Sequence, residues 1–135
     1  MDEQSQQLLK AIQDTGVLPA HVKPERALSN VVCILSRRLT RGEAAHVVKS
    51  LPQGLEPLLN RCIVGRDERG DIFDRDMFLR QVAAYLSVSE RRAEDIAAAV
   101  LGTVKNYLSA EEVENVASQL PKDLHDFWCY SSSAA

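Results

Sequence analysis

Glu43 and His46, two residues that could bind a metal, stand three positions apart. Residues at i and i+3 share a helix face, and this spacing is typical of two-metal carboxylate bundles. Such a centre needs a second Glu-x-x-His, but 69 residues later the chain has Glu112-x-x-Asn115. Thr40 before Glu43 instead forms the pattern of a helix-capping box, which accounts for the glutamate. We expect no metal site and no cofactor.

Other catalytic patterns are equally incomplete. His125 and Cys129 stand four residues apart and could both reach one ion, but two further ligands are lacking, so a surface histidine beside a partly buried thiol is the better interpretation. No Gly-x-Ser-x-Gly signature marks a nucleophile, and no glycine-rich phosphate loop occurs. The sequence therefore predicts a protein that is not an enzyme, with no catalytic residues and no small-molecule substrate.

A basic spot at Arg37, Arg38 and Arg41 suggests a second class of function. Two helices joined there would resemble a helix-turn-helix, whose cations contact phosphates. Phosphate binding needs many cations, however, and the chain has a net charge of −3 and no broad basic face. Nucleic acid is therefore an unlikely partner, and a nucleic-acid-binding regulator is kept only as the alternative function.

Two short segments that follow a Leu-Pro pair carry large apolar residues, and the second ends in Phe127, Trp128 and Tyr130. These residues either close the core of each half or form an exposed face for a protein partner. Tryptophan and tyrosine are favoured anchors of interfaces. We therefore expect a protein partner or self-association, with these aromatics as the anchor. The arginine spot and the acidic residues Glu111, Glu112 and Glu114 would set the orientation.

The same pattern occurs twice, 69 residues apart, which indicates an internal duplication. Leu39-Thr40-x-x-Glu43 with Leu51-Pro52 corresponds to Leu108-Ser109-x-x-Glu112 with Leu120-Pro121. The sequence predicts a first repeat over 1–66 and a second over 67–135. Because neither repeat is large, we expect one joint domain with a shared core.

Apolar spacing and capping residues predict four helices in each repeat, with Thr40, Asp74, Ser89 and Ser109 as predicted N-caps. The expected helices cover residues 6–14, 24–39, 41–50, 52–59, 75–86, 90–107, 110–117 and 121–128. A charged stretch with a glycine, 66–71, is the expected linker. No segment alternates with period two for long enough to predict a strand. The fold class is therefore all-α, a single bundle of about eight helices.

Composition limits the remaining questions. No apolar run approaches the roughly 20 residues needed to span a bilayer, and the acidic start of the sequence does not resemble a signal peptide. We expect a cytoplasmic protein without membrane insertion. Cys33, Cys62 and Cys129 are odd in number and far apart, so reduced thiols are expected. Residues 1–67 carry a net charge of +2 and residues 68–135 a net charge of −5, so the halves could attract each other.

These motifs resemble a bacterial family known as domain of unknown function 2267. The resemblance rests on Arg38-Leu39-Thr40-x-x-Glu43-Ala44 with Ser50-Leu51-Pro52, Phe78-Leu79-x-x-Val82, Ala99-Val100-Leu101, and Gln119-Leu120-Pro121-x-x-Leu124, and covers roughly residues 8–128. It implies a small all-α protein of two similar helical repeats and no established reaction. Pro57 stands where the second repeat has Asp126, so the fourth helix should be distorted or begin later.

Overall fold

The computed structural model describes residues 2–62 and 73–131, which form eight α-helices, two 3₁₀ turns and no strand. The predicted all-α class is confirmed. In chain order the elements are α1 (Glu3–Asp14), α2 (Pro24–Ser36), α3 (Arg41–Ser50), η1 (Gln53–Leu55), α4 (Glu56–Leu59), η2 (Asn60–Cys62), α5 (Arg75–Leu86), α6 (Glu90–Lys105), α7 (Ala110–Ser118) and α8 (Lys122–Tyr130).

Four helices, α3, α5, α6 and α7, begin directly after their predicted polar caps, whereas α1 begins at Glu3, three residues earlier than predicted. Each predicted cap accepts a hydrogen bond from the backbone N–H three residues later, which satisfies one of the unpaired donors of the first turn. These caps are Thr40, Asp74, Ser89 and Ser109. Gly16 has a φ of +76° and follows α1, as expected of a glycine that ends a helix. The second helix ends at Ser36, three residues earlier than predicted.

Pro57 has the predicted effect on the fourth helix. The segment after Pro52 begins as the 3₁₀ turn η1, and α4 begins only at Glu56, with Pro57 in its first turn. A proline in the first turn lacks an N–H that would have no partner anyway. The matching segment of the second half, α8, is continuous over nine residues.

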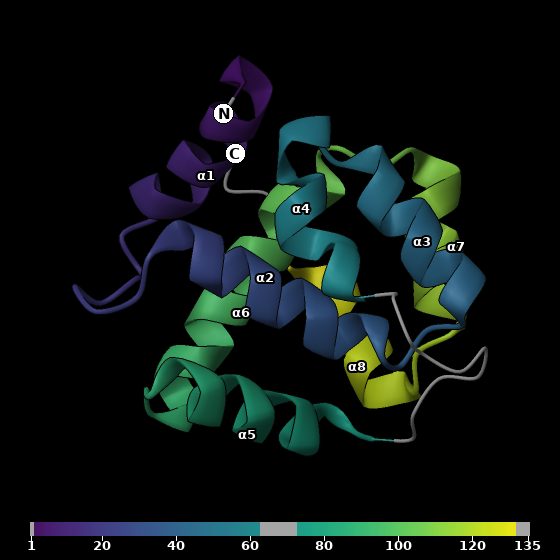
Figure 1. Cartoon of the computed structure of the whole chain (residues 1–135). Helices are drawn as coiled ribbons and strands as arrows, with labels where there is room; N and C mark the ends of the chain where they lie inside the picture. The colour runs from purple at the N-terminus through teal and green to yellow at the C-terminus, as the bar shows by residue number, and fades with distance from the viewer. Residues whose placement is uncertain (1, 63–72, 132–135) are drawn as a thin grey trace.

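The core forms where α2 crosses α6 (Figure 1). α2 packs against α1 and α4 of the first half and against α5 and α6 of the second half. α1 also packs against α6, and α8 packs against α5, α6 and α7. One cluster of buried apolar side chains joins residues from both halves. Figure 1 also shows α3 and α7 side by side, on the far side of the molecule from α1.

Side chains of the first half cap the carboxyl end of α5. Arg26 donates from Nη2 to the Tyr85 carbonyl, and His21 Nε2 lies 3.0 Å from the Leu86 carbonyl. In return, Arg92 Nη1 donates to the Val17 carbonyl at 3.1 Å. The last carbonyls of a helix have no partner within the helix and attract donors. These bonds therefore fix the α1–α2 connection to the α5–α6 turn.

Two of the three cysteines form a disulfide, so the prediction of reduced thiols is wrong for Cys33 and Cys62. The 3₁₀ turn η2 packs against α2 and brings the two Cα atoms to 4.6 Å. No local pattern in the sequence indicates this pairing, because a separation of 29 residues becomes a contact only through tertiary packing. A cross-link over such a loop stabilises a fold by roughly 3–4 kcal/mol.

Two expectations fall on residues outside those described. The predicted linker 66–71 lies there, and so does the boundary between 1–66 and 67–135. The order of helices is the same in both halves, α1 to α4 and α5 to α8, which is what the duplication predicts. The duplication itself remains an interpretation of the sequence. In the part of the chain that the structure describes, no helix is both long enough and apolar enough to cross a bilayer.

Candidate functional site

Trp128, the predicted anchor of a partner surface, is a core residue. Its side chain is 1% exposed, and its indole Nε1 donates to the Val113 carbonyl at 3.1 Å. It also lines an apolar void of about 10 Å³ with residues of α2, α3, α6 and α7. A partner cannot reach this side chain in the folded protein. The spacing of apolar residues in α8 correctly placed Trp128 on the apolar face of this helix. It did not show that other helices of the protein cover this face.

Phe127 also makes its contacts within the molecule. Its ring meets the Phe78 ring edge-on, with the centroids 6.2 Å apart. The Arg75 guanidinium lies 5.3 Å from the centroid of the Phe127 ring, a cation–π geometry. Arg75 is held in turn by Glu94 at 2.9 Å. Phe127 therefore helps to join α8 to α5.

Tyr130 is the one predicted aromatic that faces solvent. Its side chain is 84% exposed, more than Met77 at 44% or Tyr85 at 50%. It lies at a groove of about 290 Å³ between α1 and α6, which is lined by Ala11, Thr15, Ala98, Ala99, Thr103, Asn106 and Tyr130. The small side chains of Ala98 and Ala99 on α6 leave room beside α1. The predicted anchor thus reduces to Tyr130 and this groove.

The three arginines do not form a uniform surface. Arg37 and Arg41 are exposed at the connection between α2 and α3, whereas Arg38 is half-buried. The Arg38 Nε is buried without a hydrogen-bond partner among the described residues. The predicted basic spot is therefore smaller at the surface than its sequence suggests.

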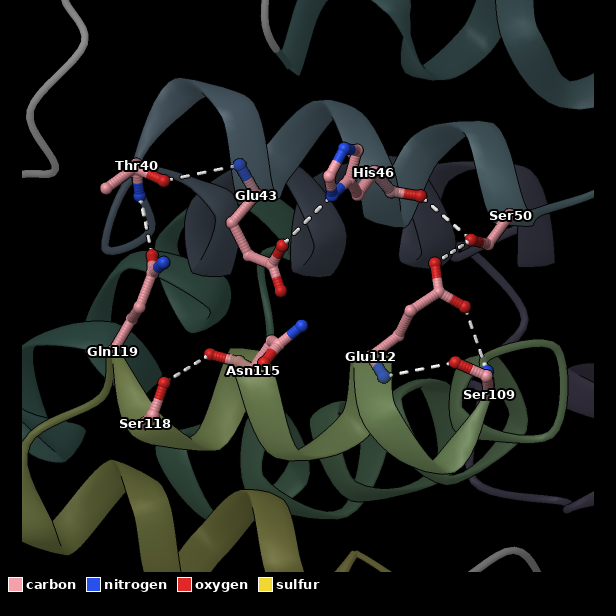
Figure 2. A network of polar contacts seen from close by, with 9 residues as sticks. All are labelled: Thr40, Glu43, His46, Ser50, Ser109, Glu112, Asn115, Ser118 and Gln119. Atoms are coloured by element: carbon pink, nitrogen blue, oxygen red, sulfur yellow. Dashed lines mark hydrogen bonds and ion pairs between the residues drawn. The ribbon is translucent and has the colours of Figure 1, made fainter.

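A network of polar contacts joins α3 to α7 (Figure 2). The two helices are antiparallel, because the start of each meets the end of the other. Gln119, after α7, accepts from the Thr40 backbone N–H at 2.8 Å through its Oε1. At the opposite end, the Ser50 hydroxyl contacts the Glu112 carboxylate. Ser50 Oγ also lies 2.9 Å from the His46 carbonyl, and its single proton serves one acceptor at a time.

Glu112 completes a capping box. It accepts from the Ser109 backbone N–H at 2.9 Å, and Ser109 Oγ accepts from the Glu112 N–H at 3.1 Å. The bond from the Ser109 backbone is the largest cause that lowers the pKa of Glu112, and the bond from Ser50 is the next. Both hydrogen bonds favour the charged carboxylate.

Glu43 departs from its predicted role. Thr40 caps the Glu43 N–H, but Gln119 takes the Thr40 N–H that Glu43 was expected to bind, so the capping box is only half formed. The Glu43 carboxylate is 7% exposed and lies 3.5 Å from His46 Nδ1. Its Oε1 has no hydrogen-bond partner within the described segments. The sequence missed Gln119, because a glutamine side chain that crosses between helices leaves no periodic signal.

The chemistry of this network is that of helix termini. The contacts Thr40–Gln119 and Ser50–Glu112 cross between α3 and α7, and the other contacts drawn lie within one helix or its cap (Figure 2). Val47 of α3 and Val116 of α7 are buried in the core. Across residues 2–62 and 73–131, no three His, Cys, Asp or Glu side chains have the arrangement needed to hold a metal ion. The network joins the ends of two helices.

The fold is thus that of a small helical protein with a shared core and a polar seam between α3 and α7. The chain matches the family of uncharacterized conserved proteins DUF2267 over residues 5–127, and it belongs to that family. This confirms the resemblance predicted from the sequence. No curated protein matches the chain significantly.

Replacement of Trp128 by alanine should lower the free energy of unfolding by about 3–5 kcal/mol, because it empties a fully buried site. Urea unfolding measures this change. Tyr130→Ala is the matched control and should shift stability by less than about 0.5 kcal/mol, since its side chain is exposed. Equal effects of the two substitutions would contradict the core placement of Trp128.

Replacement of Glu112 by alanine should cost about 1–2 kcal/mol at neutral pH, since it removes a capping bond and the contact with Ser50. The folded-state pKa of Glu112 lies below the unfolded value. Its contribution is therefore present above the unfolded pKa and is lost as pH falls through the folded pKa. The difference between wild type and variant in urea should shrink as the solution is acidified.

Glu111→Ala, an exposed first-turn glutamate, is the control for this experiment. It keeps the capping box and the contact with Ser50, so its effect should be smaller than that of Glu112→Ala. A Glu112 effect of the same size at neutral and acid pH would show that the carboxylate charge does not contribute.

Proposed function

We propose that this protein is a protein-interaction module, an accessory, adaptor or regulatory subunit of a larger bacterial assembly. The exposure of Tyr130 beside the α1–α6 groove is the observation that supports it most directly. A tyrosine exposes a large rigid ring and a hydroxyl, and such residues supply much of the binding energy of interfaces. The partner surface consists of Tyr130 and the small residues that line this groove.

The shape of this surface suits a protruding side chain or a helix of a partner. Ala11, Ala98 and Ala99 contribute small apolar side chains to the lining of the groove. Thr15, Thr103 and Asn106 contribute hydroxyl and amide groups to the same lining, and Thr103 is the most buried of them. A surface that mixes apolar and hydrogen-bonding groups is the usual composition of a specific interface.

A non-enzymatic role is supported by how the polar side chains are used. Thr40, Ser109 and Glu112 cap helices, and Gln119 and Ser50 join α3 to α7. Their hydrogen-bonding capacity is directed at the protein's own backbone and neighbouring side chains. A catalytic group must instead reach a bound substrate.

A cytoplasmic location belongs to this proposal and rests on the sequence. The Cys33–Cys62 disulfide argues against it, because disulfides persist mainly in oxidising compartments. Alkylation of free thiols in intact cells before lysis decides the question. A chain with all three cysteines alkylated supports the cytoplasm, and a chain with one alkylated cysteine supports an oxidising compartment.

The alternative, a nucleic-acid-binding regulator that uses Arg37, Arg38 and Arg41, is weaker after the structure. Arg38 is half-buried, and the protein is acidic overall. A titration of binding to duplex DNA against salt separates the two functions, since phosphate contacts make affinity fall with salt. Binding that weakens steeply with salt, and that is lost in Arg41→Gln, would favour the alternative.

Replacement of Tyr130 by alanine should weaken association with the partner by about 2 kcal/mol or more, because anchors of this kind dominate interfaces. Affinity capture from the native host, with wild type and variant compared by quantitative mass spectrometry, identifies the proteins that depend on Tyr130. Light scattering of the purified chain tests self-association in the same way.

Met77→Ala is the control, since it removes another exposed apolar side chain on α5. Capture should be unchanged in this variant. A monomeric protein whose captured set is the same for wild type, Tyr130→Ala and Met77→Ala would contradict the proposed surface.

A further inference from the structure

A second groove, of about 440 Å³, contains the thiol that the disulfide leaves free. It lies between α6, α7 and α8, and Cys129 of α8 is exposed there rather than partly buried as the sequence suggested. Val113 and Ala117 form an apolar part of its wall. Three ionisable side chains, Lys105, Glu114 and His125, line it with the thiol.

His125 stands one helical turn before Cys129. Cys129 Sγ lies 3.9 Å from both His125 Nδ1 and His125 Nε2. The Asp126 carboxylate lies 3.4 Å from His125 Nδ1, so it favours the tautomer with the proton on that nitrogen. Nε2 is then the free acceptor, and the imidazole can take the proton of the thiol.

Lys105 brings a positive charge from α6 to the same groove. Its Nζ donates to the Trp128 carbonyl and lies 5.4 Å from the centroid of the Trp128 ring. Burial is the larger influence and lowers the pKa of Lys105, whereas the charge of Cys129 raises it. The ammonium and the thiolate therefore attract each other, and a desolvated ammonium favours further anionic neighbours.

We propose that Cys129 is a site of reversible covalent modification that takes small disulfides bearing carboxylate groups. His125 accepts the thiol proton, and the sulfur lone pair of Cys129 attacks the nearer sulfur of the disulfide. A new bond forms between Cys129 and the nearer sulfur as the old sulfur–sulfur bond breaks. The electron pair of the broken bond stays on the distal sulfur, which leaves as a thiolate. The imidazolium returns the proton to that leaving group, so no external oxidant is needed.

Lys105 provides the preference for an anionic ligand, because its ammonium attracts a carboxylate near the reacting sulfur. Glu114 lines the same groove and opposes this preference. The two residues should therefore change the charge selectivity of the reaction in opposite directions. This inference concerns the α6–α7–α8 groove and does not depend on the proposed docking at Tyr130.

The test compares two disulfides of opposite charge on the full oxidised chain. Dithiobis(nitrobenzoate) is dianionic and cystamine is dicationic, and stopped-flow kinetics give the rate of each. The selectivity ratio is the rate with the anionic reagent divided by the rate with the cationic reagent. This ratio should be higher in the folded wild type than in the urea-unfolded chain. Lys105→Gln should reduce this ratio about fivefold and Glu114→Gln should raise it, as expected for one charge near the sulfur. Added salt should weaken the preference.

Controls separate this claim from a general effect on folding. Lys10→Gln, an exposed lysine of α1 outside the groove, should leave the ratio unchanged. His125→Gln should slow both reagents alike. Cys129→Ser should abolish the reaction, and a remaining reaction would overturn the proposal because Cys33 or Cys62 would then carry it. The proposal is also overturned if the selectivity ratio of wild type equals that of the unfolded chain. The same holds if neither Lys105→Gln nor Glu114→Gln changes the ratio.

Discussion

The packing of α2 against α5 and α6 is the contact on which the rest of the structure depends. Nine of the thirteen residues of α2 are buried, and α2 packs against α5 and α6 of the other half as well as against α1, α4 and η2 of its own. α6 is buried in the same way between α1, α2, α5 and α8. Neither half could cover these apolar faces by itself, so the hydrophobic free energy of folding is shared between them.

The polar contacts follow from this shared core. Because α2 lies across α5, His21 and Arg26 come within reach of the last carbonyls of α5. Because the core brings α3 and α7 together as an antiparallel pair, the end of each helix supplies a partner for the start of the other. Gln119 caps Thr40, and Ser50 contacts Glu112. These bonds fix how the helices meet after apolar burial has brought them together.

The sequence predicted the local features well, since they depend on neighbouring residues. The caps at Thr40, Asp74, Ser89 and Ser109 need only a few residues of context, and so does the late start of the fourth helix at Glu56, which Pro57 causes. The predictions from the sequence failed where the outcome depends on residues that are distant in the chain. The apolar residues of α8 have the same spacing whether this face of the helix is buried or exposed, so the spacing does not show that Trp128 is buried. The Cys33–Cys62 disulfide forms only because η2 packs on α2. Gln119 replaces Glu43 as the partner of Thr40 for the same reason.

The surface that remains after these contacts is what the function must use. Trp128 and Phe127 support the core, which leaves Tyr130 with its groove and, separately, Cys129 with its ionisable neighbours. Both lie at the end of α8, so this helix is held by its buried face and presents two chemically different groups to solvent.

The shared core is tested most directly by urea unfolding of the intact chain, followed by two probes at once. Far-ultraviolet circular dichroism reports all helices, and the fluorescence of the single tryptophan reports the site where α8 meets the core. A shared core predicts coincident transitions with one midpoint and one slope. Two separated transitions, with the tryptophan following only one of them, would show that the halves fold independently and would contradict this account.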